Sequence, residues 1–362
     1  MVVADNRFMM IDRRVDFAYG YRMRCESCHS SSWLTAEDHA GSPEAVMRCS
    51  ACGEEFNFGR AVIDLRDPDD AALDDCLLPQ LAWYHTTTDP DWPRSSKLLA
   101  DGELAELRKD GLSEGRRMTY GRRQENQALH LGTYEAAIES MLRRMRNQSD
   151  RDSTFYLHRI RIRDGLAIEP GWRDENHAEA AKVTATELAN DGLDVIRYLN
   201  AYESMGGLSV AVVRGSIAAT QRFALPISGL IRAPNSAVIE RMRTLRNSVH
   251  AVQAKHANDP LSAIDRIRKK RSVRAGEPFV RSTAPETYDA VAELERLVEH
   301  TYLGAVSPVI RGDVMKSVGS PGAAANHEMD LVWLEKIRNI AALVTQYDEV
   351  IELFDNQSWL TV

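Results

Sequence analysis

Cys25-Glu-Ser-Cys28 and Cys49-Ser-Ala-Cys52 are two cysteine pairs that decide the fold of the first part of this chain. Twenty residues separate them, and each has the two-residue spacing of a zinc knuckle. Gly53 follows the second pair and allows a tight turn that points backbone amides at the sulfurs. We therefore expect residues 1–63 to form a β-rich zinc ribbon. Because four thiolates leave no open coordination position, the zinc ion should be structural.

The composition is that of a globular protein. The chain has 362 residues, 44% hydrophobic and 27% charged, and a net charge of −8, which argues against a general polyanion binder. The fifth cysteine, Cys76, follows an acidic tract and is expected to be a buried thiol. No apolar run has the length of a membrane span, and residues 1–21 lack a secretory core. We expect a cytoplasmic protein with no membrane partner.

The pattern along the chain predicts an α+β fold with further units after the ribbon. Residues 64–76 are acidic and contain Pro68, and are expected to form a linker or an exposed turn. Residues 77–232 alternate short apolar runs with helical segments, which favours a mixed α+β catalytic domain. Residues 233–362 carry apolar side chains at helical spacing, for example Val238, Met242, Leu245 and Val249, and are expected to form a helical domain.

The elements expected between these boundaries can be stated as ranges. The strands are expected at Phe17–Met23, Ala45–Arg48, Phe56–Val62, Leu81–His85, Ala128–Gly132, Phe155–Ile162, Val195–Tyr198 and Leu208–Val213. Helices are expected at Ala100–Lys109, Tyr134–Asn147 and His177–Asp191, and Thr133 is available to cap the second of them.

Three segments in the middle of the chain carry polar and aromatic residues that are candidates for a functional site. They are Trp83-Tyr84-His85-Thr86-Thr87 at the end of a strand, Leu129–Ala137 where a strand turns into a helix, and Tyr198–Glu203 before Gly206-Gly207 and another strand. Each alone has an ordinary structural explanation, such as a packed histidine, a helix cap or a solvated glutamate. Their joint occurrence is what indicates a functional site.

In these segments the sequence resembles the ADP-ribosyltransferase superfamily, in its diphtheria-toxin and poly(ADP-ribose)-polymerase-like class. Members carry a histidine on an early strand, an aromatic residue on a strand-to-helix segment, and a glutamate on or before a late strand. Here His85, the Leu129–Ala137 segment and Glu203 stand in that order, and the resemblance covers roughly residues 80–225. It implies an enzyme whose substrate is NAD.

The resemblance also implies roles for individual residues. Glu203 would stabilise the positive charge that develops on the ribose when the nicotinamide bond breaks. His85, assisted by Thr87, would anchor the adenosine ribose. The family usually places a tyrosine against the nicotinamide; this sequence departs by offering His130 on the strand and Tyr134 at the helix start.

Supporting residues follow from the same comparison. Asn200 and Ser209 would orient the Glu203 loop. Arg122 or Arg123 would either pair with the pyrophosphate or belong to an exposed loop.

The acceptor of the ADP-ribose is left open between several classes. Basic clusters at Arg266–Arg271 with Arg274, and at Arg143, Arg144, Arg146 and Arg151, favour nucleic acid (RNA or DNA) over a protein acceptor, although they also suit solvated helix faces. The alternatives are an NAD glycohydrolase or phosphorylase, and a non-enzymatic zinc-ribbon adaptor. By analogy with small ADP-ribosyltransferases, we expect a toxin or anti-phage defence effector, with an antitoxin or regulatory protein as partner.

Overall fold

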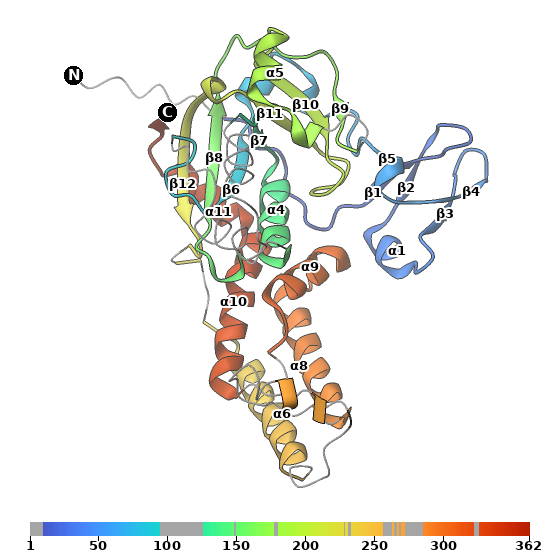
Figure 1. The fold of residues 1–362 in the computed structure, drawn as a ribbon, viewed down its shortest axis with the longest axis vertical. Helices are drawn as coiled ribbons and strands as arrows, with labels where there is room; N and C mark the ends of the chain where they lie inside the picture. Colours follow the sequence, from blue (N-terminus) through green and yellow to red (C-terminus); the bar gives the residue numbers. More distant parts are fainter. Residues whose placement is uncertain are drawn as a thin grey trace.

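The computed structural model describes residues 10–94, 126–147, 150–176, 180–227, 229–230, 233–255, 263, 266–267, 269–271, 285–321 and 326–362. In these residues the fold is mixed α+β, as predicted, with small sheets beside the cysteine pairs, two larger sheets above, and a group of helices below (Figure 1). The expected helix Ala100–Lys109, both loop arginines Arg122 and Arg123, and the basic residues Arg268 and Arg274 lie outside the described residues.

The segment that runs from β1 to β5, here called the cysteine module, contains two small antiparallel sheets. Strand β1 (Tyr21–Arg24) pairs with β2 (Ser31–Leu34) on one side and with β5 (Ile63–Asp64) on the other. Strands β3 (Val46–Arg48) and β4 (Glu55–Asn57) form the second sheet. Helix α1 (Ala36–Gly41) begins after Thr35, whose side chain accepts a hydrogen bond from the backbone of Asp38. Neither β2 nor α1 was predicted.

The central region is built from two four-stranded sheets. One sheet has the order β13-β12-β8-β6, formed by Leu360–Thr361, Ile217–Ala224, Tyr156–Ile162 and Trp83–Thr87. The other has the order β7-β11-β10-β9, formed by Leu129–Leu131, Leu208–Val212, Val195–Leu199 and Arg173–Asp174. Backbone bonds between Tyr84 and Gly132 join β6 to the end of β7 and so connect the two sheets.

Helix α4 (Tyr134–Asn147) follows β7 directly and has the predicted bounds. The backbone of Ala136 donates to the Thr133 hydroxyl at 3.1 Å, so Thr133 caps this helix as expected. The expected helix His177–Asp191 is reduced to α5 (Ala185–Asn190), which Thr184 and Glu187 begin with a capping box. Short 3-10 turns lie at Arg60–Val62, Ala71–Leu73, Leu78–Gln80, Asp150–Asp152, Ala180–Lys182 and Arg214–Ser216.

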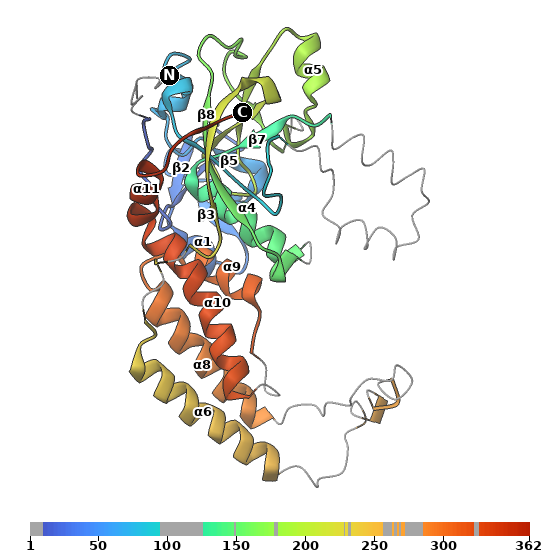
Figure 2. The same cartoon turned by 90° about the vertical axis from the view of Figure 1, so that its left-hand side faces the viewer.

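The C-terminal helices form an arm below the sheets (Figures 1 and 2). They are α6 (Ser236–Lys255), α8 (Pro285–Leu303), α9 (Pro308–Val318), α10 (His327–Thr345) and α11 (Tyr347–Asp355). Helices α10 and α11 meet at Gln346, which caps the C-terminus of the first and the N-terminus of the second. None of the helices in the described part of the chain has the length and apolar character of a membrane span.

The hydrophobic cores cross the boundaries expected from the sequence. One cluster joins Tyr84 and Leu157 of the sheet to Tyr134 of α4 and to apolar residues of α6 and α8–α11. A second joins Cys25 and Cys49 to Val195 and Val210 of β10 and β11. The domain boundaries near residues 63 and 233 therefore stay predictions, while the packing across them is continuous.

One expectation for residues 64–76 is corrected. Cys76 is exposed and not buried, because the Asp74 carboxylate accepts its backbone N–H in a surface turn, whereas Leu78 is fully buried just beyond it. Other parts of this acidic tract are packed: Asp64 belongs to β5, and Ala72 is 0% exposed, with its backbone N–H bonded to the Asp70 carboxylate. Asp70 and Asp74 thus cap short turns, and the assignment of the tract as a linker stays a prediction.

A buried ion pair in the arm yields the first prediction. Arg246 of α6 and Asp330 of α10 are paired with side chains only 2% and 0% exposed. Arg246→Ala leaves a buried carboxylate unpaired and should lower the free energy of unfolding by about 3–5 kcal/mol. Arg243→Ala removes an exposed ion pair with Glu240 on the same helix and should cost less than about 1 kcal/mol. Denaturant titration of both variants measures the difference, and equal losses would contradict this account of the arm.

Candidate functional site

The four knuckle cysteines lie together. The Sγ atoms of Cys25 and Cys52 are 3.8 Å apart, those of Cys28 and Cys49 are 3.6 Å apart, and all four lie within 4.8 Å of one another. A tetrahedral ion with bonds of about 2.3 Å requires sulfurs about 3.8 Å apart, so the donor set fits a metal ion such as zinc.

Each of the two knuckles contains a backbone turn of the same type. The N–H of His29 donates to the carbonyl of Cys25, and the N–H of Gly53 to that of Cys49. His29 and Gly53 both have left-handed backbone, with φ of 59° and 77°. The backbone of Ala51 donates to Cys49 Sγ at 3.4 Å, which is the amide-to-sulfur contact predicted from the sequence.

Glu203 lies in a tightly bonded loop, residues 200–207, between β10 and β11. The N–H of Asn200 donates to the carbonyl of Gly207, and that of Gly206 to the carbonyl of Asn200, both at 2.9 Å. Gly206 has a φ of 81°, and a Cβ there would lie 2.8 Å from the carbonyl oxygen of Asp64, so only glycine fits. At the base of the loop the Asn200 amide donates to the Ser209 hydroxyl at 2.9 Å.

The Glu203 carboxyl is 8% exposed and forms an ion pair with Arg143 of α4. Burial raises its pKa above the ordinary value, although the nearby Arg143 guanidinium acts in the opposite direction. The Arg143 side chain is 43% exposed, whereas that of Glu203 is only 11% exposed. The carboxylate is thus fixed in the protein, and its partner reaches in from solvent.

Tyr202 lies at the surface beside this ion pair. Its ring is 41% exposed and packs under the guanidinium of Arg60 at 4.1 Å, with that of Arg143 at 5.9 Å. An exposed aromatic ring between two arginines borders the open side of Glu203.

Two further carboxyls, on half-buried glutamates, hold the loop, and sequence reasoning missed both. Glu139 of α4 accepts the backbone N–H of Ser204 at 2.7 Å and the Tyr19 hydroxyl at 2.6 Å, and burial raises its pKa to about 8. Glu175 accepts the backbone N–H of Ala201 at 2.7 Å, and burial raises its pKa to about 7. Glu139 stands four residues before Arg143 and therefore on the same helix face, which is a signal the sequence does contain.

His85 and His130 lie on neighbouring strands and are linked. His85 Nδ1 is 3.0 Å from the carbonyl oxygen of His130, and its ring stacks on Trp92 with centroids 4.5 Å apart. Burial lowers the pKa of His85 to about 3 and that of His130 to about 4, so both rings are neutral at physiological pH. Across the β6–β8 pair, His158 lies opposite His85 and also contacts Trp92.

The His130 ring connects this pair to the Glu203 loop. Its Nδ1 is 3.0 Å from the Tyr198 hydroxyl, and its Nε2 is buried with no hydrogen-bond partner among the described residues. Burial raises the pKa of Tyr198, and the Glu175 and Glu203 carboxylates raise it further. His85, His130 and Tyr198 are therefore linked by hydrogen-bond distances, and the charge of Glu203 is close enough to act on Tyr198.

Two candidate residues, Tyr134 and Thr87, are buried and form hydrogen bonds within the protein. Tyr134 is 1% exposed, and its hydroxyl donates to the carbonyl of Leu343 at 3.0 Å inside the core. Its ring is therefore part of the core, which leaves His130 as the other ring of the two candidates. Thr87 is buried two residues after His85, and its hydroxyl accepts the backbone N–H of Asp89 in the turn toward Trp92.

The arginines proposed as a polyanion surface are largely engaged within the protein. Arg144 pairs with Asp150, Arg146 pairs with Asp313, and Arg151 donates to the carbonyl of Ser317. Arg143, the fourth member, holds Glu203. This cluster therefore supports the fold more than it offers free charge to a nucleic acid.

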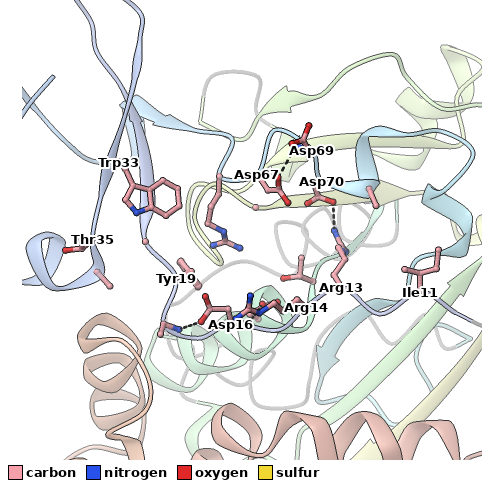
Figure 3. A pocket seen from close by; sticks show the side chains of 18 of the residues that line it. Ile11, Arg13, Arg14, Asp16, Tyr19, Trp33, Thr35, Asp67, Asp69 and Asp70 are labelled. Carbon is pink, nitrogen blue, oxygen red and sulfur yellow. Dashed lines mark hydrogen bonds and ion pairs between the residues drawn. The ribbon is translucent and has the colours of Figure 1, made fainter. Parts of the chain in front are cut away.

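A cavity of about 780 Å³ separates the cysteine module from the central region (Figure 3). Tyr19 and Trp33 line it on the module side, and Arg13, Arg66 and Gly207 line it elsewhere. The Arg13 guanidinium packs 4.3 Å from the Trp83 ring centre and 3.7 Å from the Asp70 carboxylate. Because Arg66 and Gly207 belong to its wall, the cavity borders the back of the Glu203 loop.

Comparisons of the chain with protein-family models, curated proteins and solved structures find no match.

The cysteine geometry predicts one bound metal ion per chain. Cys25→Ser and Cys49→Ser each remove a ligand, and the purified variants should lose bound zinc, measured by elemental analysis. Cys76→Ser is the matched control, because that thiol is exposed and lies outside the cluster. Zinc content that is unchanged in Cys25→Ser would contradict the assignment.

The raised pKa of Glu139 predicts a pH dependence of stability. Burial raises that pKa from 4.5 to about 8, so the folded state binds more protons across this range and the free energy of unfolding falls as pH rises through it. The buried histidines act oppositely, since their lowered pKa values make them cost stability only below their unfolded value of about 6.5. These histidines are His85, His130 and His158.

The test therefore compares the change in stability between pH 6.5 and pH 8 in the unmodified chain with that in the variant, because the histidines contribute equally to both chains. Glu139→Gln should flatten a decline that can reach about 1.4 kcal/mol per pH unit for one proton. Glu335→Gln, an exposed change on α10, should leave the decline unchanged. Denaturant titrations at the two pH values measure it, and an equal slope in Glu139→Gln would remove the assignment of a raised pKa.

Proposed function

We propose that this chain is an NAD-dependent ADP-ribosyltransferase that transfers ADP-ribose to a macromolecule. The observation that carries the proposal is the unequal ion pair of Glu203, a buried carboxylate on a hydrogen-bonded loop whose cation is a largely exposed arginine. Such a carboxylate is preorganised to meet a positive charge, and Arg143 marks where that charge lies. Cleavage of the nicotinamide–ribose bond develops an oxocarbenium-like charge on the ribose, which is the charge such a site would stabilise.

Arg143 has a second role in this proposal. When the ribose takes its position against Glu203, the guanidinium moves away without leaving the carboxylate uncompensated. A guanidinium at the rim suits the pyrophosphate of NAD, since arginine forms paired hydrogen bonds with phosphate oxygens. The exposed ring of Tyr202, between Arg60 and Arg143, adds a flat face at the same rim.

The histidines supply neutral polar groups in this scheme. His85 would hold the adenosine ribose, its orientation fixed by the stack on Trp92 and by the contact to the His130 carbonyl. His130 would present its ring to nicotinamide, and its buried Nε2 has no bond to another described residue. Both pKa values are lowered by burial, so neither ring would repel the positively charged nicotinamide of NAD.

The proposed acceptor is a nucleic acid, with a protein as the alternative. Arg144, Arg146 and Arg151 are bonded within the fold, so the first basic cluster offers less free positive charge than the sequence pattern indicates. In the other basic cluster Arg266, Lys270 and Arg271 are exposed, and exposed basic groups are what a nucleic-acid acceptor binds. The cysteine module carries more acids than arginines between residues 20 and 63, which favours the protein alternative for that surface.

An experiment with labelled NAD distinguishes four hypotheses: a protein acceptor, a nucleic-acid acceptor, NAD breakdown without transfer, and a non-enzymatic adaptor. The chain is incubated with adenine-labelled NAD and cell lysate, and the products are digested with protease or nuclease. Label released as modified peptides supports the proposal with a protein acceptor, and label in nucleotides supports the nucleic-acid acceptor. Nicotinamide release with no labelled macromolecule would indicate a glycohydrolase or phosphorylase. No release at all would reject enzymatic activity and favour a zinc-ribbon adaptor.

Glu203→Gln is the sharpest single test of the mechanism. The amide keeps the size of the side chain and removes the negative charge, so nicotinamide release should fall by about 10³-fold or more. Thermal melting and zinc content should stay close to those of the unmodified chain. Glu335→Gln on α10 is the matched surface control and should retain full activity. Retained turnover in Glu203→Gln would reject this glutamate as the catalytic group.

A further inference from the structure

The cysteine module reaches the Glu203 loop through one short segment, residues 60–66, here called the strap. The strap begins with the turn Arg60–Val62, continues as strand β5, and ends at Arg66. The 780 Å³ cavity lies beside the strap, between the module and the central region (Figure 3). The strap is therefore a hydrogen-bonded connection between the two, in addition to the apolar core that they share.

One end of the strap belongs to the cysteine module. Strand β5 pairs with β1, and Cys25 follows β1 directly, so the strap and the first knuckle share one sheet. The Asp64 carboxylate accepts from Arg24 at 2.9 Å and from the Ser31 hydroxyl, both on strands of that sheet. Any loosening of the knuckles would thus reach the strap through its backbone pairing.

The other end clamps the loop that carries Glu203. The Arg66 backbone N–H donates to the carbonyl of Gly206 at 2.7 Å, and its guanidinium donates to the Ser204 hydroxyl at 3.1 Å. The same guanidinium packs 4.0 Å from the ring centre of Tyr19, whose hydroxyl bonds Glu139. The close approach of the Asp64 carbonyl to Gly206 excludes any side chain between strap and loop.

From these contacts we propose that the strap positions Glu203, and that Arg66 is a positioning residue through which metal binding by the cysteines sets the order of the loop. The catalytic consequence rests on the proposed function, whereas the structural coupling does not. The four cysteines would hold the metal ion, and the strap would transmit the order of that site to residues 200–207. The coupling gives the module a function even though its closed coordination shell leaves the ion no chemistry of its own.

Hydrogen exchange of the full-length chain tests the coupling without reference to activity. The reporting amides are those of Ser204, Gly206 and Gly207, which are bonded to Glu139, Asn200 and Ser204. Arg66→Ala should raise their exchange rates by about tenfold or more, which corresponds to about 1.4 kcal/mol of lost protection. Removing the metal ion with a strong chelator should raise exchange at the same amides.

Two variants make the result specific. Arg243→Ala removes an equal charge from an exposed ion pair with Glu240 on α6, away from the strap, so the loop should stay protected. Arg66→Lys keeps the charge over Tyr19 and should restore part of the protection. If Arg66→Ala does not fold, Arg60→Ala is used, because it removes the exposed contact to Tyr202 and should raise exchange at the start of the loop.

Kinetics add a readout that general destabilisation would not reproduce. In Arg66→Ala the kcat for nicotinamide release should fall at least tenfold while the KM for NAD stays within about twofold, because the loop and not the NAD anchor is disturbed. Unchanged loop exchange in both Arg66→Ala and the metal-depleted chain would overturn the coupling. If the unmodified chain releases no nicotinamide, the proposed function fails, and the exchange result still decides whether the strap holds the loop.

Discussion

The β10–β11 hairpin is buried on both faces, and the rest of the structure depends on this constraint. Its strands contact the core of the cysteine module on one face and the cluster beside α5 on the other. A hairpin enclosed in this way carries its loop into the protein, where each backbone polar group needs a partner. Arg66, Glu139 and Glu175 supply those partners from three distant parts of the sequence. The loop is ordered because the alternative would be unpaired polar groups away from water.

The same burial sets the electrostatics of the site. Each carboxyl beside the loop loses hydration, and the pKa values of Glu139, Glu175 and Glu203 are all raised. Arginines compensate this effect unequally: Arg143 pairs directly with Glu203, whereas Arg66 lies near Glu139 and bonds the loop. Glu203 is therefore the carboxyl of the three with a direct ion-pair partner that reaches it from solvent, within the described residues. This asymmetry separates it as a candidate catalytic group from two carboxyls that hold the loop.

Local features were predictable from the sequence, and long-range ones were not. The strands β6, β7, β10 and β11 and helix α4 follow from apolar runs and helix-forming residues, and the knuckles follow from their spacing. Strand β12 (Ile217–Ala224) was missed because its buried Gln221 looks polar in the sequence, yet its amide donates to the carbonyls of Phe354 and Gln357 near the other end of the chain. Glu175 was missed for the same reason, since only the fold brings it to residue 201.

The cysteine module and the central region pack into one another. A unit of about sixty residues buries little surface by itself, and this one completes its core with apolar residues of β6, β10 and β11. Conversely, the loop of the β10–β11 hairpin completes its hydrogen bonds with Arg66 next to β5. The central region therefore supplies apolar burial to the cysteine module, and the module supplies hydrogen-bond partners to the Glu203 loop. A module joined in this way is part of the scaffold of the site and not an appendage beside it.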